Sequence, residues 1–165
     1  CLALGICLTV SLLSGATYGL DRGSNAVQWS VDDGGNNHWY ETVQVPDDVN
    51  CFDEIRLIAL DLGGEMVIIQ SEAENSFVID LLDGTSDYLI GLIQNLSSPD
   101  YSEPGGGWEW VDGAPLDNSY WDVSGQEPGD TNGTQNFCGI WSGGWYDVYE
   151  CDYDYPQSAV VEWSN

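Results

Sequence analysis

The sequence has almost no basic residues. Its 165 residues include 2 Lys and Arg residues in total, both of them arginine, against 28 Asp and Glu residues, which gives a formal net charge of −26. Because proteins bind phosphate backbones with Lys and Arg, this balance argues against nucleic acid and anionic membranes as partners. It favours divalent cations and basic partners instead. The acidic residues are scattered rather than gathered in a tail, as is typical of a solvated acidic surface.

Residue types that carry catalysis are also scarce. The chain has 1 histidine, His38, which lies in a strand-like stretch where a structural role is expected. No nucleophile is paired with a base, no His/Cys cluster has metal-ligand spacing, and no glycine loop is built to cradle phosphate. The sequence therefore predicts a binding protein rather than an enzyme.

One uncharged apolar run stands out, at the N-terminus. Residues 1–19 carry no charge, and residues 2–13 form an apolar stretch too short to span a bilayer comfortably. Ser14, Gly15 and Ala16 then supply the small residues of a signal-peptide cleavage site. We interpret residues 1–19 as a signal peptide, or as an apolar segment that is retained and packs against other subunits. Residues 20–165 are then one domain of a secreted, extracellular protein without a membrane span in its mature form.

Cysteine usage agrees with export. Apart from Cys1 and Cys7 near the N-terminus, the chain has Cys51, Cys138 and Cys151. Cys138 and Cys151 flank a predicted hairpin, so a disulfide between them is expected in an oxidising compartment. Cys51 is then unpaired, or joined to a partner that the sequence does not reveal.

The first half of the domain shows strand and helix periodicity in turn. Residues 26–45 predict two strands around a turn, and residues 51–62 place apolar side chains three and four apart, as on one face of a helix. Residues 65–70 predict a short buried strand. The uninterrupted apolar run at residues 88–93 predicts a fully buried strand.

A second helix is predicted to begin at Ser71. The stretch Ser71-Glu72-Ala73-Glu74 is a capping box, in which Ser71 caps the helix and the Glu74 side chain reaches back to the Ser71 amide. The apolar residues of 77–82 are expected to face the core, and Gly84 to end the helix.

Residues 94–135 lose this periodicity. They are rich in Gly, Pro, Asp, Asn and Ser, with one strand-like interruption at residues 107–113. Long segments without regular structure are more often functional than accidental, so we expect the ligand-binding surface here. Strand patterns return at residues 136–141 and 145–151, around a turn, and at residues 159–163.

Eight short motifs, in this order and spacing, resemble the C-type lectin-like domain, most of all its secreted bacterial branch. They are HWYE, LGGEMVIIQSEAEN, IGL, WEWVDGAPL, EPG, NFCGIW, GGWYDVYEC and VVEW. The resemblance covers about residues 26–163. It implies an α+β fold in which two helices flank small antiparallel sheets, the N- and C-terminal strands pair, and a long loop region carries the ligand site.

The resemblance also bears on the disulfides. Members of the family often join the first helix to the last strand by a disulfide, and the matching residues here are Ala59 and Val161. Apolar packing is therefore expected to hold that contact. The second family disulfide matches Cys138 and Cys151.

Sugar-binding members of the family use calcium ligands that also bind sugar hydroxyls. Glu127 and Asp147 match two of these positions, and Asn136 matches a carboxylate position while keeping one oxygen. Gly129 and Tyr146 stand where the family has asparagine. Because calcium takes six to eight oxygen ligands, calcium dependence stays open.

Neighbouring residues extend this candidate site. Pro128, in the cis form, would turn the flanking side chains outward together. Asp130 is close enough in sequence to replace a lost ligand, so the predicted metal-binding set is Glu127, Asp130, Asn136 and Asp147. Trp121 and Trp141 are the tryptophans expected to be exposed for stacking against a sugar.

Two functions follow from this pattern. The first is a secreted binding module that recognises glycans through the long loop region, with or without calcium. The alternative is a structural or assembly subunit that uses the fold for protein–protein contacts, for example in a filament or surface layer. The missing calcium-binding oxygens and the many surface carboxylates favour the alternative.

Overall fold

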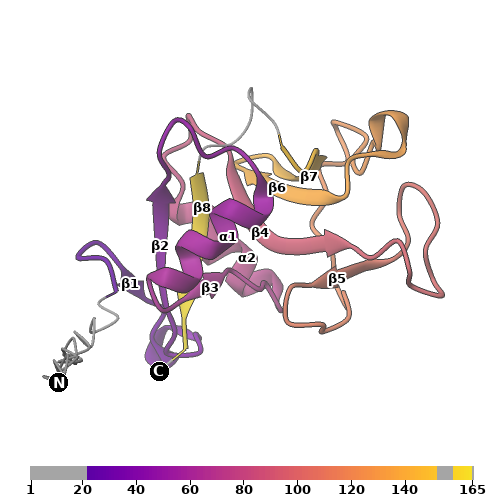
Figure 1. Cartoon of the computed structure of the whole chain (residues 1–165). Coiled ribbons are helices and arrows are strands. Elements are labelled where there is room, and N and C mark those ends of the chain that lie inside the picture. The colour runs from indigo at the N-terminus through magenta and orange to yellow at the C-terminus, as the bar shows by residue number, and fades with distance from the viewer. Residues whose placement is uncertain (1–21, 152–157, 165) are drawn as a thin grey trace, which may run out of the picture.

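The computed structural model describes residues 22–151 and 158–164, which contain two helices and eight strands (Figure 1). The helices are α1 (Phe52–Asp61) and α2 (Glu72–Leu81). The strands are β1 (Val27–Gln28), β2 (Trp39–Gln44), β3 (Glu65–Met66), β4 (Tyr88–Gln94), β5 (Trp108–Trp110), β6 (Phe137–Trp141), β7 (Gly144–Val148) and β8 (Ser158–Trp163). This agrees with the predicted α+β class.

The strands form one connected sheet. Its order is β1-β2-β8-β4-β6-β7, with β3 paired to β8 and β5 paired to β4. The early strand β2 is antiparallel to the last strand β8, as the resemblance implied. However, β4 and β8 are parallel where Leu89 faces Ala159. Every other pairing between these strands is antiparallel, as expected, and this one parallel contact of β4 links the two halves into one mixed sheet.

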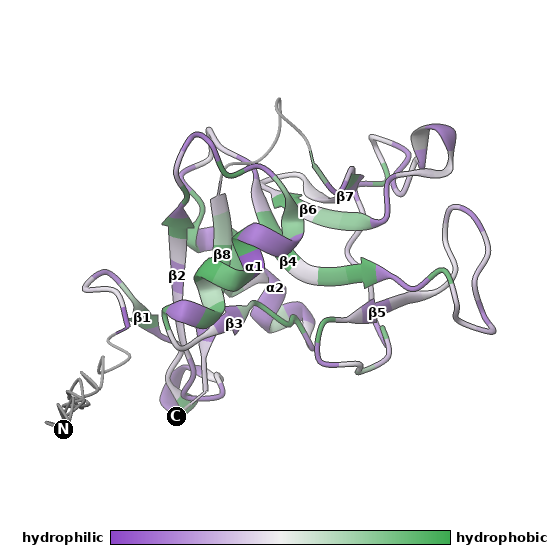
Figure 2. Ribbon diagram, viewed as in Figure 1, coloured by the Kyte–Doolittle hydropathy of each residue, from purple (hydrophilic) through white to green (hydrophobic). Residues whose placement is uncertain are grey.

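Strand β4 is buried on both faces. Its side chains at Tyr88, Ile90 and Leu92 belong to one apolar cluster, and Leu89 belongs to a second cluster on the other face. All four are at most 3% exposed. A continuous apolar run is the sequence pattern of such a strand, so this prediction is confirmed. Figure 2 shows hydrophobic residues along much of β4.

The two helices cover opposite faces of the sheet. Helix α1 buries Phe52, Ile55 and Ala59 in the second cluster, while α2 buries Val78 in the first. The expected replacement of a disulfide by apolar packing is confirmed, since Ala59 and Val161 lie in the same cluster and are each 1% exposed.

Only half of the predicted capping box forms. The Ser71 hydroxyl accepts a hydrogen bond from the Glu74 amide at 3.1 Å, as expected. The Glu74 side chain does not return to Ser71. One of its oxygens accepts a hydrogen bond from the Gln70 amide at 2.8 Å, and the other accepts one from the Tyr40 hydroxyl at 2.6 Å. The side chain turns inward because the core offers it these donors.

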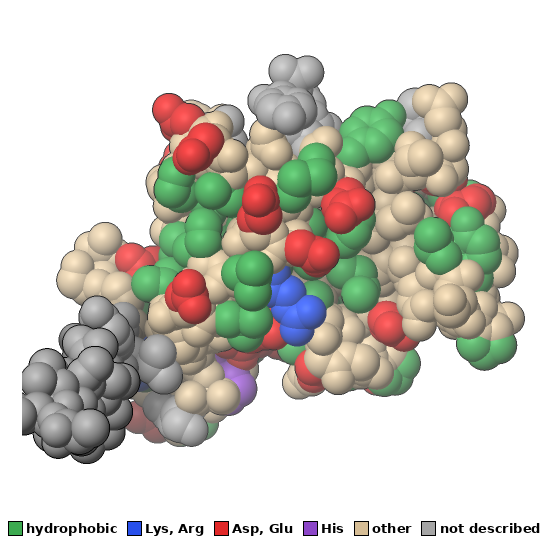
Figure 3. All heavy atoms as spheres, viewed as in Figure 1, with side chains coloured by type: hydrophobic (Ala, Val, Ile, Leu, Met, Phe, Trp, Pro, Cys, Tyr) green, Lys and Arg blue, Asp and Glu red, His purple; other side chains and the backbone are tan. Residues whose placement is uncertain are grey.

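The few basic groups are engaged by other residues. Arg56 binds the Glu65 carboxylate, with a shortest distance of 2.8 Å, and also the Val111 carbonyl at 3.2 Å. The Arg22 guanidinium lies 4.1 Å from the centre of the Trp39 ring. Figure 3 shows acidic side chains spread among hydrophobic ones over one face, with basic side chains in a single small area. The acidic excess therefore remains at the surface.

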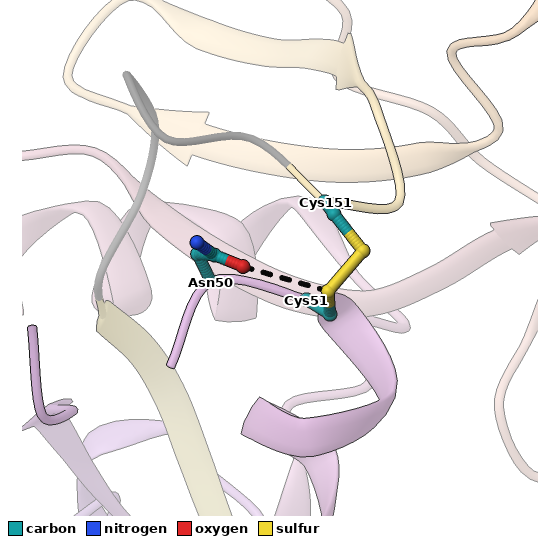
Figure 4. The surroundings of a disulfide bond; sticks show 3 residues. All are labelled: Asn50, Cys51 and Cys151. Atoms are coloured by element: carbon teal, nitrogen blue, oxygen red, sulfur yellow. Dashed lines mark hydrogen bonds between the residues drawn. A yellow bond between two sulfur atoms is a disulfide. The ribbon is translucent and has the colours of Figure 1, made fainter. Parts of the chain in front are cut away.

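The predicted disulfide was wrong. Cys51 is bonded to Cys151 across a separation of 100 residues, and Cys138 is a free, buried cysteine (Figure 4). Cys138 lies inside β6 opposite Asp147, so it points into the core. Cys151 lies beyond the end of β7 and faces Cys51 at the start of α1, where the Phe52 amide donates to the Glu150 carbonyl at 2.7 Å. Cys138 and Cys151 flank the hairpin in the sequence, but they do not lie opposite each other in the fold.

Removing this cross-link is expected to destabilise the domain. The double variant Cys51→Ser, Cys151→Ser should lower the free energy of unfolding by about 2–5 kcal/mol, because the unfolded chain is no longer constrained. Denaturant unfolding measures this, with Cys138→Ala as the control that keeps the cross-link. Non-reducing peptide mapping that joined Cys138 to Cys151 would contradict the assignment.

Candidate functional site

The candidate site lies in the loops beyond β4 and β5. Figure 1 shows these loops extending from the side of the sheet away from β1, next to the β6–β7 hairpin. The buried residue Asp122 orders the loop between β5 and β6 through its hydrogen bonds. Its Oδ1 accepts hydrogen bonds from the Ser124 amide at 2.8 Å and the Gly125 amide at 3.1 Å, and its carbonyl accepts one from the Glu127 amide at 3.1 Å. The sequence analysis missed Asp122, although Asp followed by Ser and Gly is a common turn pattern.

Glu127 and Asp147 form the centre of the site. The Gly129 amide donates to Glu127 Oε2 at 3.1 Å and to Asp147 Oδ1 at 3.0 Å. The Asp130 amide donates to Asp147 Oδ2 at 2.5 Å. The Glu127–Pro128 bond is cis, as the resemblance implied. Backbone amides thus fasten residues 127–130 to the buried Asp147 on β7.

The two carboxyl groups also interact with each other. Burial of Glu127, together with the hydrogen bond and negative charge of Asp147, raises the pKa of Glu127 to about 7. Two adjacent carboxylates repel, and a shared proton relieves that repulsion. At neutral pH this pair therefore carries less than its full formal charge.

Asn136 and Asp130 are placed differently. The Asn136 Oδ1 is buried and accepts no hydrogen bond within the described part of the chain. Asn136 lies two residues before Cys138, which faces Asp147, so side-chain alternation puts it on the Asp147 side. Asp130 Oδ1 instead accepts from the Gln135 amide at 3.3 Å, within its own loop. The structure therefore brings together Glu127, Asp147 and the Asp130 backbone, with Asn136 on the same face.

The residues present do not complete a calcium site. A Cβ added at Gly129 would lie 3.6 Å from Glu127 Oε2 and 3.9 Å from Asp147 Oδ1, so the missing side chain leaves a gap facing both carboxylates. Tyr146 packs on Gly139 on the other face of the hairpin and supplies no oxygen here. Two carboxylates and one amide oxygen fall short of the six to eight oxygens that calcium takes. Among the described residues, no group of three or more His, Cys, Asp or Glu side chains is arranged to hold a metal ion.

The two candidate tryptophans lie apart from the carboxylate pair. Trp121 is half-buried in an aromatic cluster, with ring centroids 4.9 Å from Trp108 and 5.9 Å from Trp145. Trp141 is 41% exposed, at the turn of the β6–β7 hairpin. Its strand position shares a face with Gly139 rather than with the residue opposite Asp147. Of the two, Trp141 alone offers an exposed indole.

A second polar cluster lies at the other end of the sheet. A pocket of about 250 Å³ is lined by His38, Glu74 and Glu162, among others. His38 Nδ1 lies 2.5 Å from Glu162 Oε1, and the Tyr40 hydroxyl donates to Glu74. Burial raises the pKa of the Tyr40 hydroxyl and of the Glu74 carboxyl. The Ile68 amide donates to the remaining Glu162 oxygen at 3.2 Å. Every oxygen of the two carboxylates thus has a partner, which agrees with the structural role expected for His38.

The comparisons with known proteins identify the family. The model of the Lectin C-type domain matches residues 52–157. This is more than half of the chain, which therefore belongs to the C-type lectin domain family. It is 30% identical over 111 residues to human C-type lectin domain family 4 member C, and 28% identical over 103 residues to rat C-type lectin domain family 6 member A. The matches span 44% and 42% of those relatives' lengths, and neither supports a bacterial branch.

Solved structures share the fold. The cow CD23 carbohydrate-recognition domain has a TM-score of 0.61 at 22% identity, covering 78% of this chain and 88% of that one. A calcium-independent type II antifreeze protein has a TM-score of 0.62 at 15% identity, covering 87% and 95%. These likenesses establish the fold. Within the described residues, no helix is long and apolar enough to cross a membrane.

Substituting Tyr40 tests the buried network. Tyr40→Phe should lower the free energy of unfolding by about 1–3 kcal/mol, because it removes a hydroxyl donor from the buried Glu74 carboxylate. Urea denaturation measures the change. Tyr149→Phe, at a residue 36% exposed, is the matched control and should change the free energy by less than about 0.5 kcal/mol.

Restoring a side chain at Gly129 tests the calcium analysis. We expect calorimetry to find calcium binding weaker than about 1 mM in the natural chain, and at least about tenfold tighter in Gly129→Asn, which adds an oxygen facing both carboxylates. Gly105→Asn is the matched control, because Glu103-Pro104-Gly105 repeats the triplet without an Asp147 beside it. Tight calcium binding by the natural chain would contradict the analysis.

Proposed function

We propose that the chain is a secreted binding module that recognises carbohydrate through residues 94–135 and the neighbouring β6–β7 hairpin. Recognition is direct and does not pass through a tightly held calcium ion. One observation carries this proposal: the amides of Gly129 and Asp130 fix the Glu127–Asp147 pair. The partly exposed Glu127 carboxylate can receive hydrogen bonds from sugar hydroxyls, and it can donate one when protonated.

The family supports binding rather than catalysis. The cow CD23 domain was solved in the presence of a GlcNAc2Man3 oligosaccharide, and a murine dendritic cell inhibitory receptor 2 domain of the same fold was solved in complex with an N-glycan. A calcium-independent member of the fold is also among the similar structures. The Cys51–Cys151 disulfide is of the kind that persists in secreted proteins. The predicted signal peptide lies outside the described residues.

A second candidate function is assembly through protein contacts. Leu57 and Leu60 are 60% and 43% exposed and lie three residues apart on the outer face of α1. Such a pair of apolar side chains among carboxylates is a candidate contact for another protein. A binding module for sugars has no need of it.

A glycan array with and without chelator tests the proposal. We expect binding of neutral glycans that changes less than about twofold on adding EGTA, and that weakens at least about tenfold in Glu127→Gln, because one charged acceptor is lost. Glu150→Gln, at an exposed residue just beyond the end of β7, is the matched control.

Two outcomes would contradict it. Binding that disappears with EGTA would make the chain a calcium-dependent lectin. An absence of glycan binding, together with a dimer in light scattering that Leu57→Ser dissociates, would favour assembly instead.

A further inference from the structure

A second pocket lies beside β5, apart from the carboxylate pair. Its volume is about 280 Å³, and its apolar wall consists of Ile69, Trp110, Ala114 and Pro115. The wall is held in place by pairing of the backbone: the Trp110 amide donates to the Ala114 carbonyl at 2.9 Å, and Glu109 pairs with Pro115. The pocket is therefore preformed, at the lower end of the size that small-molecule sites have.

One donor in this wall has no hydrogen-bond partner. Trp110 lines the pocket, and its indole N–H donates to no residue in the described part of the chain. The indoles of Trp108, Trp145 and Trp163 each donate to an oxygen, at 3.0, 2.8 and 2.9 Å. An indole N–H can only donate, so an unpaired one beside a pocket is available to an acceptor on a ligand. Trp110 thus offers a donor to a ligand in the pocket.

Polar side chains complete the lining. Gln70, Asp117 and Asn118 contribute two amides and a carboxylate, and within the described residues none of these side chains is engaged in a hydrogen bond. The neighbouring pocket around Glu74 and Glu162 differs, because its buried carboxylate oxygens already have partners. The pocket beside β5 therefore has free hydrogen-bonding capacity.

The composition of the lining selects the chemistry of the ligand. Neither Lys nor Arg lines the pocket, and the whole chain is strongly acidic, so an anionic ligand is disfavoured. Amides, a carboxylate and an indole N–H suit hydroxyl groups, which both donate and accept. The apolar wall suits the C–H face of a sugar ring.

We propose that this pocket binds one neutral sugar ring, as a recognition site separate from the Glu127–Asp147 pair. The proposal rests on the carbohydrate-binding function proposed above. The two sites are connected through Trp145, whose ring lies 5.7 Å from that of Trp110 and which precedes Asp147 by two residues.

The Trp110 indole provides a direct test. Titration of the full ¹⁵N-labelled chain with methyl mannoside, methyl galactoside and N-acetylglucosamine should shift the Trp110 indole resonance with at least one of them, and glucuronate should shift it less. Trp110→Phe keeps the aromatic wall but removes the donor, so it should weaken that sugar's binding about tenfold. Trp39→Phe on β2 is the matched control, and an unchanged resonance of the Trp163 indole, which donates to the Leu62 carbonyl in the other core cluster, shows that the variant is folded.

Two results would overturn the proposal in different ways. If the shifts are confined to residues 127–130 and are lost in Glu127→Gln, the sugar binds at the carboxylate pair. The proposal for this pocket is then wrong, while the proposed carbohydrate binding stands. If no sugar causes a shift and the glycan array shows no binding, both the proposal for this pocket and the proposed function are wrong.

Discussion

The structure depends on one strand that has no face exposed to solvent. Alternate side chains of β4 enter two apolar clusters, so the same seven-residue strand supports α1 on one side and α2 on the other. Strands β5, β6 and β8 all pair with it. Both loops of the candidate site therefore begin or end on strands that β4 holds in place, and a polar side chain in this strand would weaken both cores together.

The buried carboxylates of the domain and its arginines have different kinds of partner. The buried carboxylates of Glu74, Asp122 and Asp147 accept hydrogen bonds from backbone amides or hydroxyls rather than from a lysine or arginine. The two arginines are engaged elsewhere, by Glu65 and by the Trp39 ring. Because no cation balances the candidate site, neutral ligands suit it better than acidic sugars such as sialylated or sulfated glycans.

The sequence correctly predicted elements that depend on neighbouring residues. Predictions were wrong where a contact depends on residues that are far apart in the sequence. The apolar run of β4 and the Ser71 cap depend on neighbouring residues, and both were predicted correctly. The partner of Cys151 depends on where the start of α1 meets the end of the β6–β7 hairpin, which no spacing reveals. Likewise Glu74 has capping-box spacing, but Tyr40, distant in sequence, offers a closer donor.

The same distinction applies to the candidate site. Glu127 and Asp147 were found through a motif, and the structure brings them together. Trp110 was not singled out, because a strand tryptophan with an unpaired indole N–H looks in sequence like any other core tryptophan. Side-chain partners appear only after the chain is folded.

The Cys51–Cys151 bond has a topological consequence. It closes a covalent ring that contains both helices, strands β3 to β7, and the whole of the long loop region. A protease that cuts an exposed loop at any single point within that ring leaves the two pieces tethered. A nicked domain would gain only the mass of one water, and its fragments would stay joined until a reductant opened the ring.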